Sequence, residues 1–232
     1  NRPGRLHSGS SLLHPCGAVI QAVLLQFLLK TVRNAQYLYG CLPDDWYYDS
    51  DWFQKEEDGS YTFKAITGRY TILADFTHKS FRIWTMNGSE PMSLNGDGTG
   101  ALWIIGNEGV NKPTWEAGNH GGWTGVDSDV CLTPIKDKVY QVTLTVGKQL
   151  RATDVNFKFF GQANWGIEFK GQDNSHLIST DSEVFGIGDG NGHDNGNVYL
   201  KDGVELKDGE TYVLTVDLTA GVDKAVLKVE KK

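Results

Sequence analysis

The sequence has few of the residues that build a disulfide framework, a zinc site or a nucleic-acid surface. Its three cysteines are widely spaced and form no Cys-x-x-Cys pair, which argues against both a disulfide scaffold and a zinc site. Lys and Arg number 22 against 29 Asp and Glu, and the net charge is −7. Because phosphate binding needs clustered cations, we expect no nucleic-acid partner. We also expect no cofactor.

Long apolar runs are missing as well. The most apolar stretch covers residues 18–29 and is shorter than the roughly 20 residues that a membrane-spanning helix needs. Acidic residues are absent from positions 1–43, and all 29 lie from Asp44 onward. This contrast marks residues 1–43 as an atypical leader to which we assign no structure. Because the sequence begins at Asn1, we expect the chain to be a fragment or a processed product.

Motifs of catalysis are scarce. The sequence has no Gly-x-Ser-x-Gly elbow, no His-Glu-x-x-His and no P-loop. Glu108, Glu116 and Glu168 are candidates for a carboxylate pair of a glycoside hydrolase, but the sequence gives no separation between them. We therefore expect no catalytic residues, and we keep glycoside hydrolysis as the alternative.

One Gly- and Asn-rich run, residues 188–197, resembles a calcium-binding loop. Asp189, Asn191, Asp194 and Asn195 supply oxygen atoms, but Leu200 stands where an EF-hand carries its bidentate Glu. A hairpin loop is the favoured interpretation, and we name no metal ligand.

Alternating apolar and polar residues dominate the chain from Asp44 onward, and 28 glycines supply turns. The pattern predicts an all-β protein built as β-sandwiches, with a closed barrel as the alternative. The expected strands are 61–66, 69–76, 79–86, 101–105, 130–135, 139–146, 155–160, 165–169, 183–187, 198–200, 211–218 and 224–229.

A short sequence pattern occurs twice and suggests that the strands form two groups. Tyr70 and Asp75 are five residues apart and precede a strand, and Tyr212 and Asp217 repeat the arrangement. We interpret the echo as two copies of one β-module, the first truncated at its N-terminus. The prediction is a pair of tandem immunoglobulin-like β-sandwich domains, with a partial one over 44–96 and a complete one resembling a carbohydrate-binding module over 101–232.

The stretch 154–169 carries the main functional signal. In a strand, Phe157 and Phe159 share one face, whereas Asn156, Lys158 and Phe160 share the other. One face can therefore fill a core while the second presents a cation, an amide and an aromatic ring. Asn164 and Trp165 follow at a break in the strand. Flat rings beside long polar side chains suit a sugar, which has an apolar face and a polar rim.

Two further indoles lie in a polar loop. Trp115 and Trp123 flank a run rich in Gly and Asn that cannot easily bury both rings. A stacking platform and a lid packed over the end of a sandwich are equally compatible with this composition. The acidic and aromatic stretch 44–53 is interpreted as a turn, because Asp side chains readily close turns.

Several segments together resemble a known family. The runs Gly68-Arg69-Tyr70, Ala74-Asp75-Phe76 and Met86-Asn87-Gly88, the run 97–106, and Asn156–Phe160 followed by Trp165-Gly166 are similar to SusE/SusF-type surface lipoproteins of Bacteroidetes. The resemblance covers roughly residues 44–232. It implies β-sandwiches that hold glycans at the outer membrane without catalysis. It also implies ligand contacts from Trp123, Lys158 and Trp165, with Trp115, Asn164 and Phe160 beside them.

The resulting hypothesis is a glycan-binding protein at the cell surface, associated with components of an outer-membrane uptake transporter. The lipid-bearing cysteine of the family is expected to lie outside this chain, and we expect a monomer. A third alternative is a structural adaptor that docks onto the transporter. The identity of the glycan cannot be read from the residues, because it depends on loop geometry.

Overall fold

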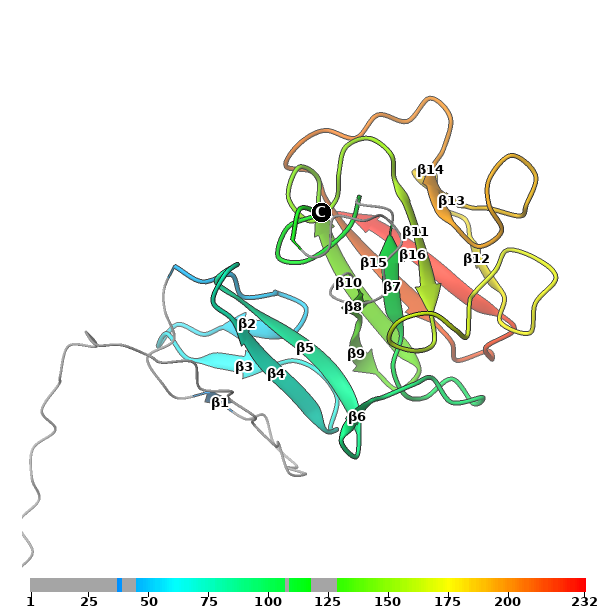
Figure 1. Cartoon of the computed structure of the whole chain (residues 1–232). Coiled ribbons are helices and arrows are strands. Elements are labelled where there is room, and N and C mark those ends of the chain that lie inside the picture. The colour runs from blue at the N-terminus through cyan, green and yellow to red at the C-terminus, as the bar shows by residue number, and fades with distance from the viewer. Residues whose placement is uncertain (1–36, 39–44, 107–108, 118–128) are drawn as a thin grey trace, which may run out of the picture.

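The structure is a computed structural model, which describes residues 37–38, 45–106, 109–117 and 129–232. Trp123 and Glu108 therefore lie outside the described residues, as does almost all of the leader 1–43. Every element of the described part is a β-strand, which confirms the all-β prediction (Figure 1). No helix in the described ranges is long and apolar enough to cross a membrane.

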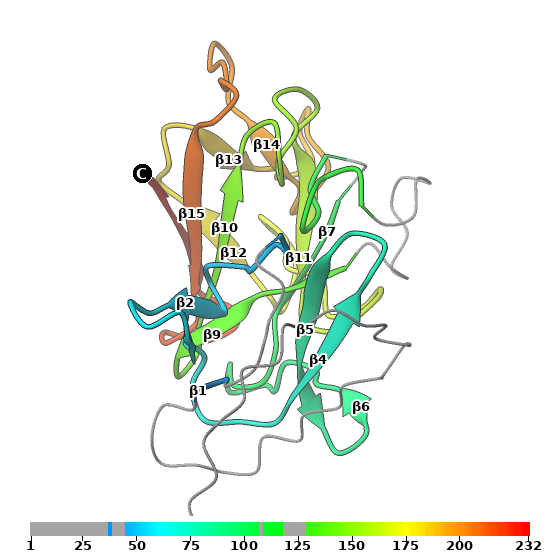
Figure 2. The same ribbon diagram turned by 90° about the vertical axis from the view of Figure 1, so that its left-hand side faces the viewer.

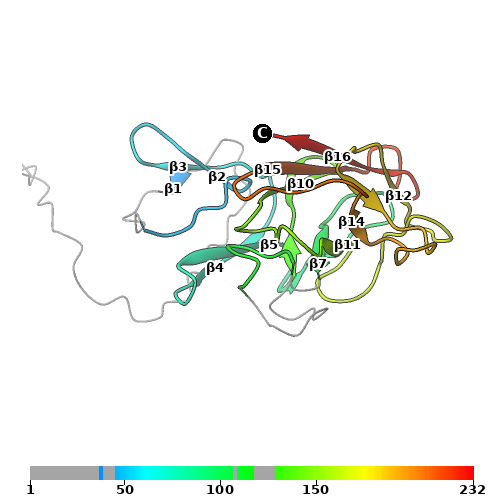
Figure 3. The same ribbon diagram turned by 90° about the horizontal axis from the view of Figure 1, so that it is seen from above.

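Two five-stranded sheets form the sandwich that occupies the C-terminal part of the chain. The front sheet has the order β13-β14-β11-β7-β8, and the back sheet has the order β12-β16-β15-β10-β9. Figure 3 shows the sheets as two layers, with the N-terminal strands to one side. The front strands are β7 (Trp103–Gly106), β8 (Val130–Cys131), β11 (Asn156–Phe160), β13 (Phe185–Ile187) and β14 (Val198–Leu200). The back strands are β9 (Thr133–Lys136), β10 (Val139–Thr145), β12 (Ile178–Thr180), β15 (Thr211–Asp217) and β16 (Ala225–Lys231).

Alternation along the strands fills the space between the sheets. Phe157 and Phe159 of β11 point inward and are completely buried, as the sequence predicted for that face. From the back sheet, Leu144 and Leu214 meet them in the same cluster. Burying a Phe or Leu side chain stabilises the fold by roughly 1.5–3 kcal/mol, so this core holds the two sheets together.

The N-terminal segment, defined here as residues 45–92, contributes two small sheets, one of which also includes the short strand at residues 37–38. One has the order β1-β3-β2 and the other β4-β5-β6. Their strands are β1 (Tyr37–Leu38), β2 (Phe53–Lys55), β3 (Tyr61–Phe63), β4 (Tyr70–Asp75), β5 (Ser80–Asn87) and β6 (Glu90–Pro91). Aromatic rings fill the space around these strands, with centroids 4.4–6.3 Å apart for the pairs formed by Tyr48, Phe53 and Tyr61.

The hydrophobic cluster of this segment is shared with the sandwich. Trp52, Phe53 and Tyr70 pack in one cluster with Trp103 and Phe160 from the outer side of the front sheet. Figure 2 shows β4 and β5 alongside that sheet. The segment is therefore a partial β-layer whose hydrophobic core is completed by the front sheet of the sandwich. The predicted boundary near residue 100 lies in the connection between β6 and β7.

Most predicted strands are present, but two differ. Residues 165–169, predicted as a strand, form a loop joined to β11 by a single bridge between Phe160 and Glu168. Asn164 and Ile167 adopt positive φ angles of 65° and 49°, which a strand cannot contain. The predicted strand 130–135 is divided between β8 and β9, because the chain passes from the front sheet to the back sheet there.

The repeated Tyr–Asp pattern corresponds to two hairpins of the same construction. Asp75 ends β4 and accepts a hydrogen bond from Thr77 N, and Asp217 ends β15 and accepts one from Thr219 N. In each case the next strand, β5 or β16, pairs antiparallel with the strand before the turn. The echo thus encodes a strand, an Asx turn and a strand.

Candidate functional site

The outer side of the front sheet is covered at one end and open at the other. Strand register places Cys131, Trp103 and Phe160 in one row across β8, β7 and β11. Trp103 and Phe160 are 3% and 0% exposed because the N-terminal segment lies over them. The next row contains Ile105 and Lys158. The third row contains Asn156, Tyr199 and Gly186 and lies beyond the part that the N-terminal segment covers.

Phe160 is a correction to the predicted ligand contacts. Its side chain lies on the predicted outer face, but a ring with no exposed surface cannot stack on a ligand. The sequence pattern gave no sign that a segment about a hundred residues earlier in the chain would cover this position. Phe160 instead supports Trp165, whose ring meets it edge to face at a centroid distance of 5.4 Å.

Trp165 is the most exposed tryptophan in the described part of the chain, at 43%. It lies near the tip of a tight loop over residues 161–167. Gly161 N donates to Ile167 O at 2.9 Å, and Leu94 N donates to Gly161 O at 2.6 Å. The Gln162 amide donates to Trp165 O. These contacts fix the loop, so the half-exposed indole is held in one place on a buried aromatic ring.

Two amide side chains of this loop have different roles. Asn164 is exposed next to Trp165 and takes the left-handed backbone conformation that asparagine tolerates better than most residues. Gln162 turns inward, and its amide contacts the place where a side chain on Gly166 would lie. Gly166 has a φ angle of 126°, a conformation that residues with a side chain rarely adopt, which explains the glycine. Asn164 remains the candidate for contacting a ligand.

Lys158 belongs to a small ion cluster beside the same buried ring. Its Nζ lies 3.6 Å from Glu168 Oε2, and Lys170 Nζ lies 3.5 Å from the same oxygen. Lys158 is on the outer face of β11 with Phe160, as predicted, and Glu168 bridges to Phe160 across the loop. The side chains of Glu168 and Lys170 are about one third exposed, whereas that of Lys158 is 12% exposed. Partly exposed ion pairs contribute little stability, so Glu168 and Lys170 are the members of the cluster whose polar atoms a ligand's hydroxyl groups can reach.

Trp115 does not lie beside Trp165 and Lys158, so its predicted place among these ligand contacts is wrong. Its ring is stacked by the guanidinium of Arg151 at 5.1 Å, and its backbone N donates to Lys148 O. Residues 148–151 precede β11, whereas Trp165 follows it, so the two indoles belong to opposite ends of that strand. The destination of a long loop depends on contacts that the sequence pattern does not encode.

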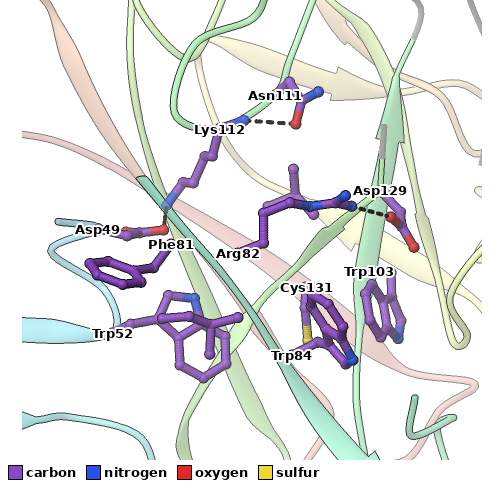
Figure 4. A pocket seen from close by; sticks show the side chains of 12 residues that line it. Asp49, Trp52, Phe81, Arg82, Trp84, Trp103, Asn111, Lys112, Asp129 and Cys131 are labelled. Atoms are coloured by element: carbon purple, nitrogen blue, oxygen red, sulfur yellow. Dashed lines mark hydrogen bonds and ion pairs between the residues drawn. The ribbon is translucent and has the colours of Figure 1, made fainter. Parts of the chain in front are cut away.

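A second group of charged residues lies buried between the N-terminal segment and the sandwich (Figure 4). Lys112 Nζ contacts Asp49 Oδ2 at 2.6 Å and Asp51 Oδ2 at 2.9 Å, and all three side chains are at most 10% exposed. Asp51 also accepts from Gln141 Nε2 and Thr143 Oγ1 of β10 at 2.8 and 2.7 Å. The adjoining cavity has a volume of about 40 Å³, enough for water molecules but too small for a sugar.

The two carboxylates respond differently to this environment. Burial alone would raise the pKa of Asp51, but the charge of Lys112 and the hydrogen bonds from Gln141 and Thr143 outweigh it and lower the pKa. Burial raises the pKa of Asp49, and Lys112 offsets only part of that effect. The predicted turn over 44–53 is present, since Asp49 Oδ1 accepts from Asp51 N. The sequence did not reveal that its carboxylates also hold a distant lysine.

The calcium-like loop and the candidate catalytic carboxylates remain to be placed. The loop 188–197 is closed by a hydrogen bond from Gly190 N to His193 O, and Asp189 Oδ1 accepts from Asn191 N. Within the described ranges, no group of three or more His, Cys, Asp or Glu residues could hold a metal ion. Of the candidate catalytic carboxylates, Glu168 is paired with two lysines and Glu116 is exposed.

Comparison with known proteins gives one result. The profile of a protein family described as "Domain of unknown function (DUF5121)" matches residues 97–219. This range includes β11 and the Trp165 loop and stops before β16. No curated protein and no solved structure matches the chain.

Proposed function

The chain belongs to the family described as the domain of unknown function DUF5121, and from that premise we propose that it binds a glycan without catalysing its breakdown. The observation that carries the proposal is the surface formed by Trp165, Asn164, Lys158 and Glu168. A large indole is 43% exposed there and is held by a buried ring and a fixed loop. Scattered apolar side chains are common on protein surfaces, but a rigid indole beside paired charges is typical of ligand recognition.

The chemistry of this surface suits a sugar ring. The apolar face of a pyranose stacks on an indole, and the hydroxyl groups at its rim both donate and accept hydrogen bonds. Lys158 and Lys170 offer donors, Glu168 offers acceptors and Asn164 offers both. Each hydrogen bond contributes about 1 kcal/mol net and the stacked ring about 1 kcal/mol more. A few such contacts give a dissociation constant of roughly micromolar to millimolar.

The cellular setting rests on the sequence resemblance to SusE/SusF-type proteins. In that setting the chain is a monomer at the outer-membrane surface that captures polysaccharide for a neighbouring uptake transporter. Weak binding suits this task, because captured chains must be released to the transporter.

The test is affinity electrophoresis of the chain in gels that contain neutral polysaccharides, followed by calorimetry with the oligosaccharides of any polysaccharide that retards it. We expect retardation that disappears in Trp165→Ala, with at least a tenfold loss of affinity, or about 1.4 kcal/mol. The matched control is Phe76→Ala, which removes a 47% exposed ring between β4 and β5.

Three outcomes contradict the proposal. Release of reducing sugars from the same panel would indicate a glycoside hydrolase. Equal retardation of the Trp165→Ala variant would move the site away from this surface. Absence of any retardation, together with capture of a transporter component, would indicate an adaptor.

A further inference from the structure

The opposite end of β11 holds an open cleft with a volume of about 400 Å³. Ligand pockets typically have volumes of about 300–1,000 Å³, so this space is large enough for a small molecule or one end of a chain. The residues that matter among those lining it are Asp154, Asn156, His193, Asp194, Asn197 and Tyr199. The sequence placed Asn156 on the polar face of its strand and Asp194 in the calcium-like loop, but it did not predict that these residues line one cleft with Tyr199 and His193.

Tyr199 lies flat on the outer side of the front sheet. It is the cross-strand partner of Asn156 on one side and of Gly186 on the other. A Cβ on Gly186 would be 2.3 Å from the Tyr199 ring, so the ring occupies the space above that glycine. The absence of a side chain at position 186 is what lets the ring lie against the backbone. Its other face is turned toward the cleft.

His193 covers that other face. The His193 and Tyr199 rings are parallel within 9°, with centroids 3.5 Å apart. His193 is exposed and belongs to the loop 188–197, where Gly190 and Gly192 have φ angles of 91° and 92°. A flat ring thus already rests on the tyrosine, in the position that a stacked sugar would take, and it is carried by a solvent-facing loop.

Two amide side chains form the floor beside this stack. Asn197 Nδ2 donates to Asn156 Oδ1 at 2.8 Å, and Asn197 is only 5% exposed. This bond leaves the NH₂ group of Asn156 as a donor and the Oδ1 atom of Asn197 as an acceptor. A donor and an acceptor held side by side match a pair of neighbouring hydroxyl groups.

Charge around the cleft limits the kind of ligand. Asp154 and Asp194 line it, and Asp154 Oδ2 lies 3.9 Å from Arg151 Nη1. Two carboxylates against one guanidinium disfavour an anionic ligand such as a phosphate or an acidic sugar. They accept hydrogen bonds from neutral hydroxyl groups. The cleft therefore favours a neutral sugar unit.

We propose that this cleft is a second saccharide-binding subsite, in which a neutral sugar stacks on Tyr199 after displacing His193. The inference rests on the proposed function and extends it. Asn156 and Phe160 are four residues apart on one strand, about 13 Å, and Lys158 lies between them on the same face. The ligand is then a polysaccharide chain that reaches from Trp165, beside the covered end of β11, to Tyr199 beside its open end.

The test compares disaccharides and hexasaccharides of neutral β-glucan, xylan, mannan and starch by calorimetry. For the unmodified chain we expect a hexasaccharide of one series to bind at least tenfold more tightly than its disaccharide, because both ends are held together. Tyr199→Ala should remove most of that advantage. Tyr199→Phe, which keeps the ring, should retain it. Gly186→Ala, which displaces the ring but removes no polar group, should behave like Tyr199→Ala.

His193 provides an independent measurement. His193→Ala should increase hexasaccharide affinity severalfold, and ligand should move the His193 ring signals in the NMR spectrum away from their stacked position. His176→Ala is the control, since that ring contacts Phe169 edge to face at 5.5 Å, away from Tyr199.

The outcomes separate the two proposals. If Trp165→Ala weakens binding and Tyr199→Ala does not, the second subsite is wrong and the proposed function remains. If no hexasaccharide binds the unmodified chain, both are wrong. A fall in affinity for His193→Ala would contradict the displacement of its ring.

Discussion

Lys112 is a residue whose importance is evident only in the folded chain. Its ammonium is enclosed by Asp49 and Asp51, which come from the N-terminal segment, while Asp51 is also held by β10. Removing one partner of a buried ion pair leaves the remaining charge without compensation, which costs far more than the pair contributes. Lys112 therefore adds a buried ionic contact to the hydrophobic cluster that joins the N-terminal segment to the sandwich.

Replacement of this lysine gives the first prediction. Lys112→Met should lower the free energy of unfolding by about 3–5 kcal/mol, because two buried carboxylates lose their cation. The measurement is urea denaturation followed by tryptophan fluorescence. Lys79→Met is the control: its contact with Asp45 is solvent-exposed at 58% and 64%, and its loss should leave stability unchanged. Equal effects of the two changes would show that burial of the pair is unimportant.

Sequence reasoning at the residue scale succeeded where local alternation decides the outcome. It separated Phe157 and Phe159 from Lys158 and Phe160 correctly, because side chains alternate along any strand. It failed for Phe160 as a ligand contact, because burial of the outer face depends on a distant segment. It missed Tyr199 and His193, since their stacking depends on Gly186, a residue on a neighbouring strand.

Hairpins are the elements that the sequence predicted best. Strand 198–200 was predicted with its observed bounds, and the hairpins β4–β5 and β15–β16 follow from Tyr and Asp at equal spacing. The strands that were not predicted, such as β6 and β12, are only two or three residues long. So short a run carries too little alternation to be recognised, and neighbouring strands alone make it a strand.

The turn of β15–β16 gives the second prediction. Asp217 accepts hydrogen bonds from Thr219 Oγ1 and Thr219 N and contacts Lys228 Nζ at 3.0 Å. These interactions lower the pKa of Asp217 to about 2. An unfolded Asp titrates near 3.9, so the folded state binds this proton less readily. The carboxylate stabilises the fold above pH about 4, and that contribution disappears as the pH falls toward 2.

NMR titration of the Asp217 carboxyl carbon should give a midpoint near pH 2. In Asp217→Asn, the stability difference from the unmodified chain should be present at pH 6 and smaller at pH 2. A midpoint near 4 would show that the turn does not hold the carboxylate.

At the scale of the whole molecule, two hydrophobic clusters hold the described residues together. The larger cluster lies between the front and back sheets, and the second joins the N-terminal segment to Trp103, Cys131 and Phe160. The family match begins at residue 97, so it leaves out the layer that covers these side chains. Separating the two parts would expose an apolar face of the front sheet, and we expect them to unfold together.

Cys131 reports on that contact and gives the third prediction. Its thiol is 5% exposed, and burial raises its pKa to about 12. At pH 8 it carries about two thousandfold less thiolate than an ordinary cysteine with a pKa of about 8.5. A variant with Cys16→Ser and Cys41→Ser leaves Cys131 as its one cysteine. Reaction of the Cys131 thiol with a disulfide reagent should therefore be slow in buffer and rapid in denaturant.

Reaction in buffer should also follow the rate of global unfolding measured by circular dichroism. A rapid reaction while the sandwich keeps its spectrum would mean that the N-terminal segment detaches by itself.

The shared second cluster also affects how the chain is made. Residues 45–92 leave the ribosome before the sandwich does, yet their aromatic rings pack against Phe160, which is synthesised later. At usual elongation rates the gap is on the order of ten seconds. During that interval the early rings have no partner surface, so nascent chains halted before residue 160 should recruit chaperones more strongly than chains that have passed it.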